Sequence, residues 1–145
     1  MEEMKDQVVI YLSKRKFLTL ATSTLNGKPN THPLAYVNIG ATTYFSTSKE
    51  SRKIKNIKEN PNVSFSIYDS TEHLDEVRSV QIEGEATVVT NEKESEEILE
   101  LLHNKFPFMK EMQLQVDSVI VKITPKTCFF IDYTKGFGNR DKIKY

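Results

Sequence analysis

The fold is decided by residues 17–68, which read FLTLATSTLNGKPNTHPLAYVNIGATTYFSTSKESRKIKNIKENPNVSFSIY. Residues 62–68 (NVSFSIY) alternate apolar and polar side chains, which indicates a strand with one buried face. Residues 17–23 (FLTLATS) alternate in a similar way, and the Asn26-Gly27 pair that follows favours a tight hairpin turn. The stretch therefore predicts antiparallel strands joined by short connections.

Three more elements are expected between these two strands. A returning strand is predicted over 30–38, a third strand over 43–47 and a short helix over 51–59. Ser51 stands where a helix-capping side chain is preferred, and Asn60-Pro61 ends the helix.

The flanking sequence adds helices and longer strands. Before the stretch it predicts an amphipathic helix over 3–15, and after it a strand over 77–90 interrupted at Gly84. A helix over 91–105, capped by Asn91, comes next. One or two strands follow over 116–131, with Pro125 at an edge or junction, and a polar tail over 132–145 has no helical or strand period. A glycine inside a strand allows a bend or bulge that lets a sheet curl. A single mainly β domain with α (α+β), built as a small closed or split barrel, is therefore expected over residues 1–145.

Composition excludes several classes of function. Lys plus Arg and Asp plus Glu both number 20, so the formal net charge is zero, and no overall attraction to nucleic acid or an anionic membrane is expected. No apolar run is long enough to cross a bilayer, and the start MEEMKDQ lacks the features of a secretory signal, which favours a cytoplasmic location. Cys128 stands in an apolar run and is expected to be a buried structural thiol.

Local charge is the most informative signal of function. Between residues 49 and 58 one acid faces five cations, which are Lys49, Arg52, Lys53, Lys55 and Lys58. The cluster begins a predicted helix and follows the hydroxyl-rich 46–48. Unpaired helix N–H groups, hydroxyls and cations together suit a phosphate monoester. The alternative is a solvated basic helix face. No aromatic residues interleave with the cations, so a nucleic-acid surface is not expected.

Residues 17–68 also resemble the FMN-binding split-barrel family typified by pyridoxamine 5'-phosphate oxidase. The resemblance rests on the Asn-Gly turn, the proline-containing second strand, the Ser-Thr end of the third strand, Ser51-Arg52-Lys53, and Asn60-Pro61 before a valine-containing strand. It implies a six-stranded antiparallel split β-barrel with flanking helices, FMN as cofactor, and a homodimer whose second subunit completes the pocket.

The resemblance also implies a set of site residues. Arg52 and Lys53 would bind the FMN phosphate with Ser46 and Thr47 beside it. The family's glutamine on the long strand aligns with Ser79, while Gln81 shares that strand face, and both are candidates. The segment along the flavin ring, contacting it largely through backbone groups, would be His32, Pro33, Leu34, Ala35, Tyr36 and Val37.

The expected function is that of an FMN-dependent oxidoreductase, similar to flavin reductases, nitroreductases or oxidases, with NADH or NADPH as a candidate donor. The chain lacks the arginine-rich end of the B6 oxidase, so vitamin B6 oxidation is not expected. His32, Tyr133 and Arg140 are candidate substrate contacts. A non-enzymatic flavin carrier or sensor is the alternative, and haem or deazaflavin stays open, with His32, His73 and His103 as the imidazoles available to haem. The histidine spacing predicts no structural metal site.

Overall fold

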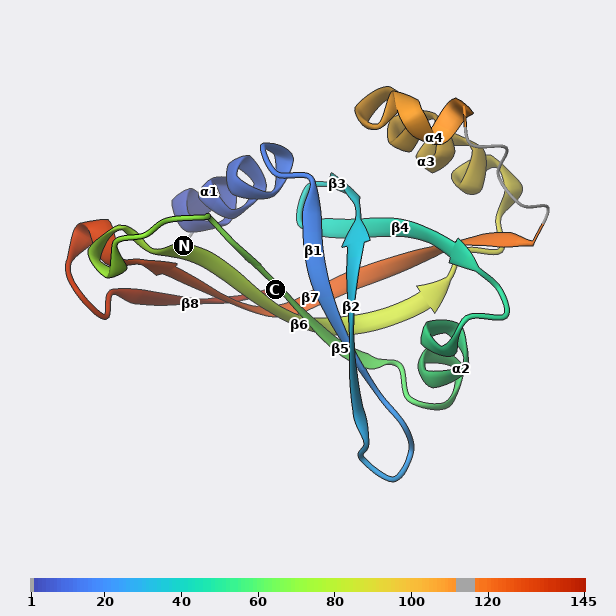
Figure 1. Cartoon of the computed structure of the whole chain (residues 1–145), viewed down its shortest axis with the longest axis horizontal. Coiled ribbons are helices and arrows are strands. Elements are labelled where there is room, and N and C mark those ends of the chain that lie inside the picture. The colour runs from blue at the N-terminus through green and yellow to red at the C-terminus, as the bar shows by residue number, and fades with distance from the viewer. Residues whose placement is uncertain (1, 112–116) are drawn as a thin grey trace.

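The computed structural model describes residues 2–111 and 117–145 (Figure 1). Its helices and strands follow one another in chain order as α1 (Glu2–Ser13), β1 (Phe17–Ser23), β2 (Pro29–Ala35), β3 (Val37–Ile39), β4 (Thr42–Ser48), α2 (Arg52–Glu59), β5 (Asn62–Tyr68), η1 (Leu74–Glu76), β6 (Arg78–Val88), α3 (Glu92–Lys105), α4 (Pro107–Glu111), β7 (Ser118–Asp132), η2 (Tyr133–Lys135) and β8 (Arg140–Lys144).

One antiparallel sheet contains every described strand. Its order is β2-β1-β5-β6-β7-β4-β3, with β8 paired to β7. The first and last strands of this path are neighbours in sequence, because only Tyr36 separates the end of β2 from the start of β3. The sheet must therefore curl until its two outer strands meet, and Figure 1 shows this half-closed barrel. We call the Tyr36 junction the seam.

The sheet pairs its longest strand, β7, with three others. β7 lies along β6 on one side, and on its other side it pairs first with β4 (Ser118–Ile123) and then with β8 (Thr127–Ile131). Pro125 stands where β7 changes partner, so its missing N–H removes no hydrogen bond to β4 or β8. The expectation that Pro125 lies at a junction is confirmed.

Gly84 lets two backbones approach closely at the bend of the sheet. The register of β6 against β7 shifts between Glu83 and Gly84, as expected for a bulge. A Cβ atom at Gly84 would lie 2.3 Å from the Thr124 carbonyl oxygen, closer than side-chain atoms approach backbone. Only glycine is accommodated here without moving β7.

The curled sheet encloses one apolar core and presents a second to α3. The enclosed core includes Val8, Tyr11 and Leu12 of α1, which covers one end of the barrel. The second core lies on the outer face of β4 and β7, where Tyr44 and Ile120 meet Ile98 and Leu102 of α3; Leu101, although apolar, is 38% exposed.

An ion pair holds the end of α1 against the sheet. Arg15 donates two hydrogen bonds of 2.8 Å to the Asp69 carboxylate, and the Tyr11 hydroxyl donates a third at 3.0 Å. The Arg15 guanidinium also lies 3.5 Å from the centre of the Tyr11 ring. These donors hold the pKa of Asp69 below its ordinary value against the opposing effect of burial.

The structure confirms the antiparallel split-barrel architecture and corrects its details. The described residues form eight strands rather than six, since the returning strand divides at Tyr36 and the tail forms another. The tail over 132–145 is not without structure: residues 140–144 form β8, whose Ile143 is fully buried. Main-chain pairing to β7 stabilises β8, and one apolar residue was too weak a signal to predict it. Val116 lies outside the described residues, and 118–132 form one strand.

No helix in the described ranges has the length and apolar character needed to span a membrane. The expected burial of Cys128 is confirmed, and it raises the pKa of the thiol to about 12, so this cysteine is inert at neutral pH.

We predict that Gly84→Ala destabilises the protein by about 1–3 kcal/mol, because the new methyl group displaces the β7 backbone at Thr124. Chemical denaturation monitored by circular dichroism measures the change. Thr87→Ala, on an exposed position of the same strand, is the matched control and should change stability by less than about 0.5 kcal/mol. Equal stability of the two variants would contradict the close approach.

Candidate functional site

The basic cluster lies at the start of α2, where Ser51 caps the helix. The Ser51 hydroxyl accepts a hydrogen bond from the Ile54 amide, and Thr47 at the end of β4 donates to Ser51 at 3.3 Å. The predicted cap is thus confirmed, and Thr47 is tied to the first turn. Helix N–H groups, hydroxyls and the Arg52 and Lys53 side chains meet at this point.

A buried amide network fastens α2 to the β1–β2 hairpin. Asn56 is 3% exposed and donates hydrogen bonds of 2.9 Å to the Thr22 hydroxyl and to the Asn30 side-chain oxygen. The Thr22 hydroxyl also lies 3.1 Å from His32 Nε2, at hydrogen-bonding distance. The network links β1, β2 and α2, so it sets the distance between the cations of α2 and the edge of β2.

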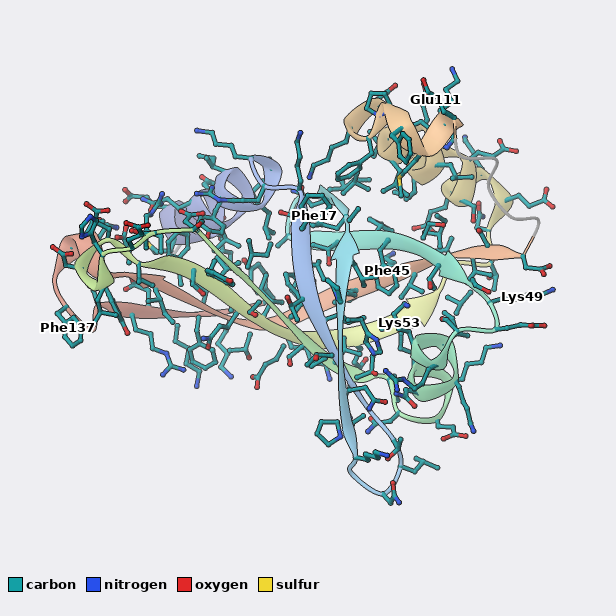
Figure 2. All side chains as sticks on the ribbon, viewed as in Figure 1. Phe17, Phe45, Lys49, Lys53, Glu111 and Phe137 are labelled. Carbon is teal, nitrogen blue, oxygen red and sulfur yellow. The ribbon has the colours of Figure 1, made fainter. Side chains whose placement is uncertain are left out.

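The imidazole of His32 faces the two cations. Burial lowers the pKa of His32, and the positive charges of Lys53 and Arg52 lower it further, so the ring is neutral at pH 7. Burial and the neighbouring Arg52 likewise lower the pKa of Lys53. Figure 2 shows Lys53 on the side of α2 that faces β2. The positive groups therefore destabilise one another in the absence of an anion.

The charge of this cluster has no acidic partner in the described part of the chain. The ion pairs found there do not include Arg52 or Lys53. Lys49 is not part of this unpaired cluster, because its ammonium forms an ion pair with Asp117 at 3.6 Å. Lys55 and Lys58 are exposed, whereas Ile54 and Ile57 of the same helix are buried. The phosphate-sized site thus reduces to Arg52 and Lys53.

Strand β2 borders this site with a free edge. It pairs only with β1 among the described strands, so the peptide groups on its other edge are available to a ligand. His32 and Leu34 turn toward the interior, whereas Pro33 is exposed on the opposite face and Ala35 is half-buried.

Three predicted residues point their side chains elsewhere. Tyr36 is fully buried, donates a hydrogen bond of 2.5 Å to the Leu12 carbonyl and belongs to the enclosed core. Val37 packs in the second core below α3. Ser46 lines a separate hollow with Ser95 and Leu99 of α3, because it stands on the face of β4 opposite to Thr47. These three can reach a ligand at α2 only through backbone groups.

Ser79 and Gln81 lie on the outer face of the sheet, away from the side that His32 faces. They share one face of β6, as expected; Ser79 is 7% exposed and Gln81 is exposed. Gln81 lines a hollow of about 380 Å³ with Thr31, Phe129 and Arg140. Neither side chain meets Arg52 or Lys53 within one chain.

The other candidate residues are scattered. Tyr133 packs against exposed Phe137 with ring centres 5.1 Å apart, at the end of the sheet far from α2 (Figure 2). His73 lies in the exposed loop before η1, and His103 lies on α3. In residues 2–111 and 117–145 no group of three or more His, Cys, Asp or Glu is placed to hold a metal ion.

Comparison with known proteins shows the family of the chain. The family model of pyridoxamine 5'-phosphate oxidase matches residues 4–132. The chain belongs to this family. General stress protein 26 of Bacillus subtilis is 37% identical over 62 residues, which are 43% of this chain and 44% of that protein, so the match spans less than half of the curated relative.

Solved structures show the same fold. A conserved hypothetical protein, Rv2991 of Mycobacterium tuberculosis, superposes with a TM-score of 0.80 at 23% identity, over 90% of this chain and 85% of that one. A heme binding protein from Mycobacterium smegmatis superposes with a TM-score of 0.78 at 15% identity, over 97% of this chain and 56% of that one. At these identities the superpositions show the fold alone.

Sequence reasoning missed the residues that position the site. Asn56 stands between the inward-facing Ile54 and Ile57, and an amide at such a position was the available signal. The sequence contains no comparable signal for its partners Thr22 and Asn30, because hydroxyl and amide residues are common on strands.

We predict that Lys53→Met raises the pKa of His32, because the variant removes a positive charge that disfavours the imidazolium form. NMR titration of the ring protons measures the shift. Lys55→Met removes the same charge from an exposed position of α2 and is the control, which should move the His32 midpoint less. Equal shifts in the two variants would show that the Lys53 ammonium does not face His32.

Proposed function

We propose that the protein binds FMN at the start of α2 and acts as an FMN-dependent oxidoreductase. The observation that carries the proposal is the positive cluster of Arg52 and Lys53, which lies beside a neutral, buried histidine and has no acidic partner among the described residues. Membership in the family supports the choice of a phosphorylated cofactor. A phosphate monoester would relieve the repulsion within the cluster.

The residues present suit the phosphate end of FMN. Arg52 offers a planar fork of donors, Lys53 offers a single ammonium, and the first N–H groups of α2 complete the set of donors, with the Thr47 and Ser51 hydroxyls beside them. His32 is held neutral and at hydrogen-bonding distance from Thr22, so it adds polar contact without a further charge.

The free edge of β2 provides the second part of the site. The unpaired peptide groups of β2 over residues 32–35 would meet the polar edge of the flavin ring and fix the ring relative to the phosphate. When bound, FMN supplies hydride transfer with a nicotinamide donor such as NADH or NADPH, and the chain supplies orientation and electrostatics. We also propose a cytoplasmic location, where such donors are available.

We further propose that the protein works as a homodimer. Ser79 and Gln81 cannot reach the Arg52–Lys53 cluster of their own chain, because they lie on the outer face of the sheet. In a homodimer, the outer sheet face of the second copy would lie against the first copy. The second copy's Ser79 or Gln81 would then approach the flavin ring bound by the first copy.

The test of function begins with an absorption spectrum of the purified protein. A bound flavin gives a yellow protein whose colour bleaches anaerobically with NADH or NADPH and returns with an acceptor such as a quinone or nitroaromatic. Flavin that binds without any turnover would favour the carrier or sensor. A Soret band, a deazaflavin spectrum or a protein that fails to bind added FMN would reject the proposal.

We predict that the double variant Arg52→Ala/Lys53→Ala weakens FMN binding by at least about a hundredfold, since hydrogen bonds from charged donors contribute about 1.5–3 kcal/mol each. Fluorescence quenching of added FMN measures the affinity. Lys55→Ala/Lys58→Ala is the matched control, because it removes two cations from the exposed side of the same helix. Comparable losses in both variants would show that overall charge, not the proposed anchor, binds the flavin.

We expect light scattering to give a mass near twice 16.7 kDa. Gln81→Arg should weaken the dimer and FMN binding together, because the added charge would lie on the interface. An undisturbed monomer that binds FMN with full affinity would contradict the homodimer.

A further inference from the structure

Lys105, the last residue of α3, extends over the seam. Its ammonium nitrogen lies 4.2 Å from the centre of the Tyr36 ring and 5.7 Å from that of Phe106. Tyr36 is fully buried, and the Lys105 side chain is itself half-buried. One side of the amine is therefore covered by aromatic surface instead of water.

A cavity of about 350 Å³ opens on the other side of this amine. Its walls come from the end of α1, from β3 and from α3, and the lining residues are Ser13, Val37, Asn38, Leu101, Asn104 and Lys105. The volume suits a small molecule. Among the described residues that line it, Lys105 is the only charged one, and the other polar groups are one hydroxyl and two amides.

Two of the polar groups beside Lys105 are already engaged with the protein. The Ser13 hydroxyl donates to the Val9 carbonyl at 2.8 Å, and the Asn38 amide donates to Ser13 and to the Gly40 carbonyl. In the described part of the chain no carboxylate forms an ion pair with Lys105. The amine therefore lacks the partner that usually keeps a half-buried lysine protonated.

The ionisable groups around Lys105 are cations or weak acids. Burial and the nearby Lys16 lower the pKa of Lys105 to about 8. Burial raises the pKa of the Tyr36 hydroxyl, so the tyrosine beside the Lys105 amine stays neutral. Arg15 faces Tyr36 from the end of α1. An ordinary lysine has a pKa near 10.4, so at pH 7.5 Lys105 would have roughly two orders of magnitude more free amine than an ordinary lysine.

We propose that Lys105 is an acyl-accepting lysine, whose amine reacts with small acyl phosphates that enter the cavity between α1 and α3. The Lys105 nitrogen attacks the carbonyl carbon and forms a C–N bond. The C–O bond to phosphate breaks with its electron pair, inorganic phosphate leaves, and the proton lost from nitrogen goes to solvent. The product is a neutral amide, which removes the repulsion from Lys16 and the desolvation of a charge.

The chemistry of the surroundings suits this class of donor. An acyl phosphate is anionic, so Lys16 favours its approach, whereas the acyl group itself is small and apolar and would lie against Val37 and Leu101. The competing interpretation is a structural one, in which the ammonium is retained by the Tyr36 ring and does not react.

The test treats the intact protein with acetyl phosphate at pH 7.5 and follows acetylation of each lysine by peptide mass spectrometry. We expect Lys105 to react at an initial rate at least tenfold above that of the exposed Lys55 and Lys58, with a rate that rises with pH and levels off above about pH 8. The excess should disappear in urea, where the cavity is lost. A Lys105 rate no higher than that of Lys55 would overturn the proposal.

Two variants separate the cavity from general exposure. Leu101→Trp fills the cavity from a position that is 38% exposed, and it should slow acetylation of Lys105 while leaving Lys55 unchanged. Lys16→Met should also slow Lys105, because it removes the attraction for the donor and raises the pKa of the amine. Unchanged rates in both variants would overturn the role of the cavity. Flavin content does not enter this readout, so its result is independent of the proposed function.

Discussion

The seam at Tyr36 is the constraint on which the rest of the structure depends. The chain leaves one end of the sheet at Ala35 and enters the other end at Val37, so the sheet has to curl until both outer strands meet. Tyr36 is held at that point by its own amide, which donates to the Lys16 carbonyl at 3.2 Å, and by its hydroxyl bond to α1. The bulge at Gly84 and the partner change at Pro125 supply the curvature that this closure needs.

The position of the candidate site follows from the same closure. β2 and β4 meet near the seam and separate away from it, and α2 lies where they have separated (Figure 1). Asn56 fixes the helix there by hydrogen bonds that would cost about 1–3 kcal/mol if broken within the protein interior. The network holds Arg52 and Lys53 of α2 beside the neutral His32, although burial and the charge of Arg52 both disfavour the Lys53 ammonium. Because the site is already ordered in this way, its side chains lose little conformational entropy when an anion binds.

The elements that the sequence predicted well are those with a strong local signal. The strict alternation of residues 62–68 and the Ser51 cap act through neighbours in the chain, and the isolated glycine at 84 is a recognised bulge signal; all three have the expected form. The directions in which side chains near the seam point could not be predicted from the sequence, because they depend on where the sheet closes. Tyr36 was therefore expected along the flavin ring and Ser46 beside the phosphate, although the side chains of both residues pack elsewhere. Leu101 follows the helical period and is nonetheless exposed, because the second core ends before it.

Strand β8 also protects the molecule from self-association of the wrong kind. The half of β7 that follows Pro125 would otherwise present a row of free N–H and C=O groups beside apolar Cys128 and Phe130, which is a template for pairing with foreign strands. β8 covers that row and is itself a short edge strand, whose exposed Arg140, Lys142 and Lys144 place positive charge beside the new edge and oppose addition of another strand. A short edge strand with such charge is an unfavourable template for amyloid-like growth on the open side of the curled sheet.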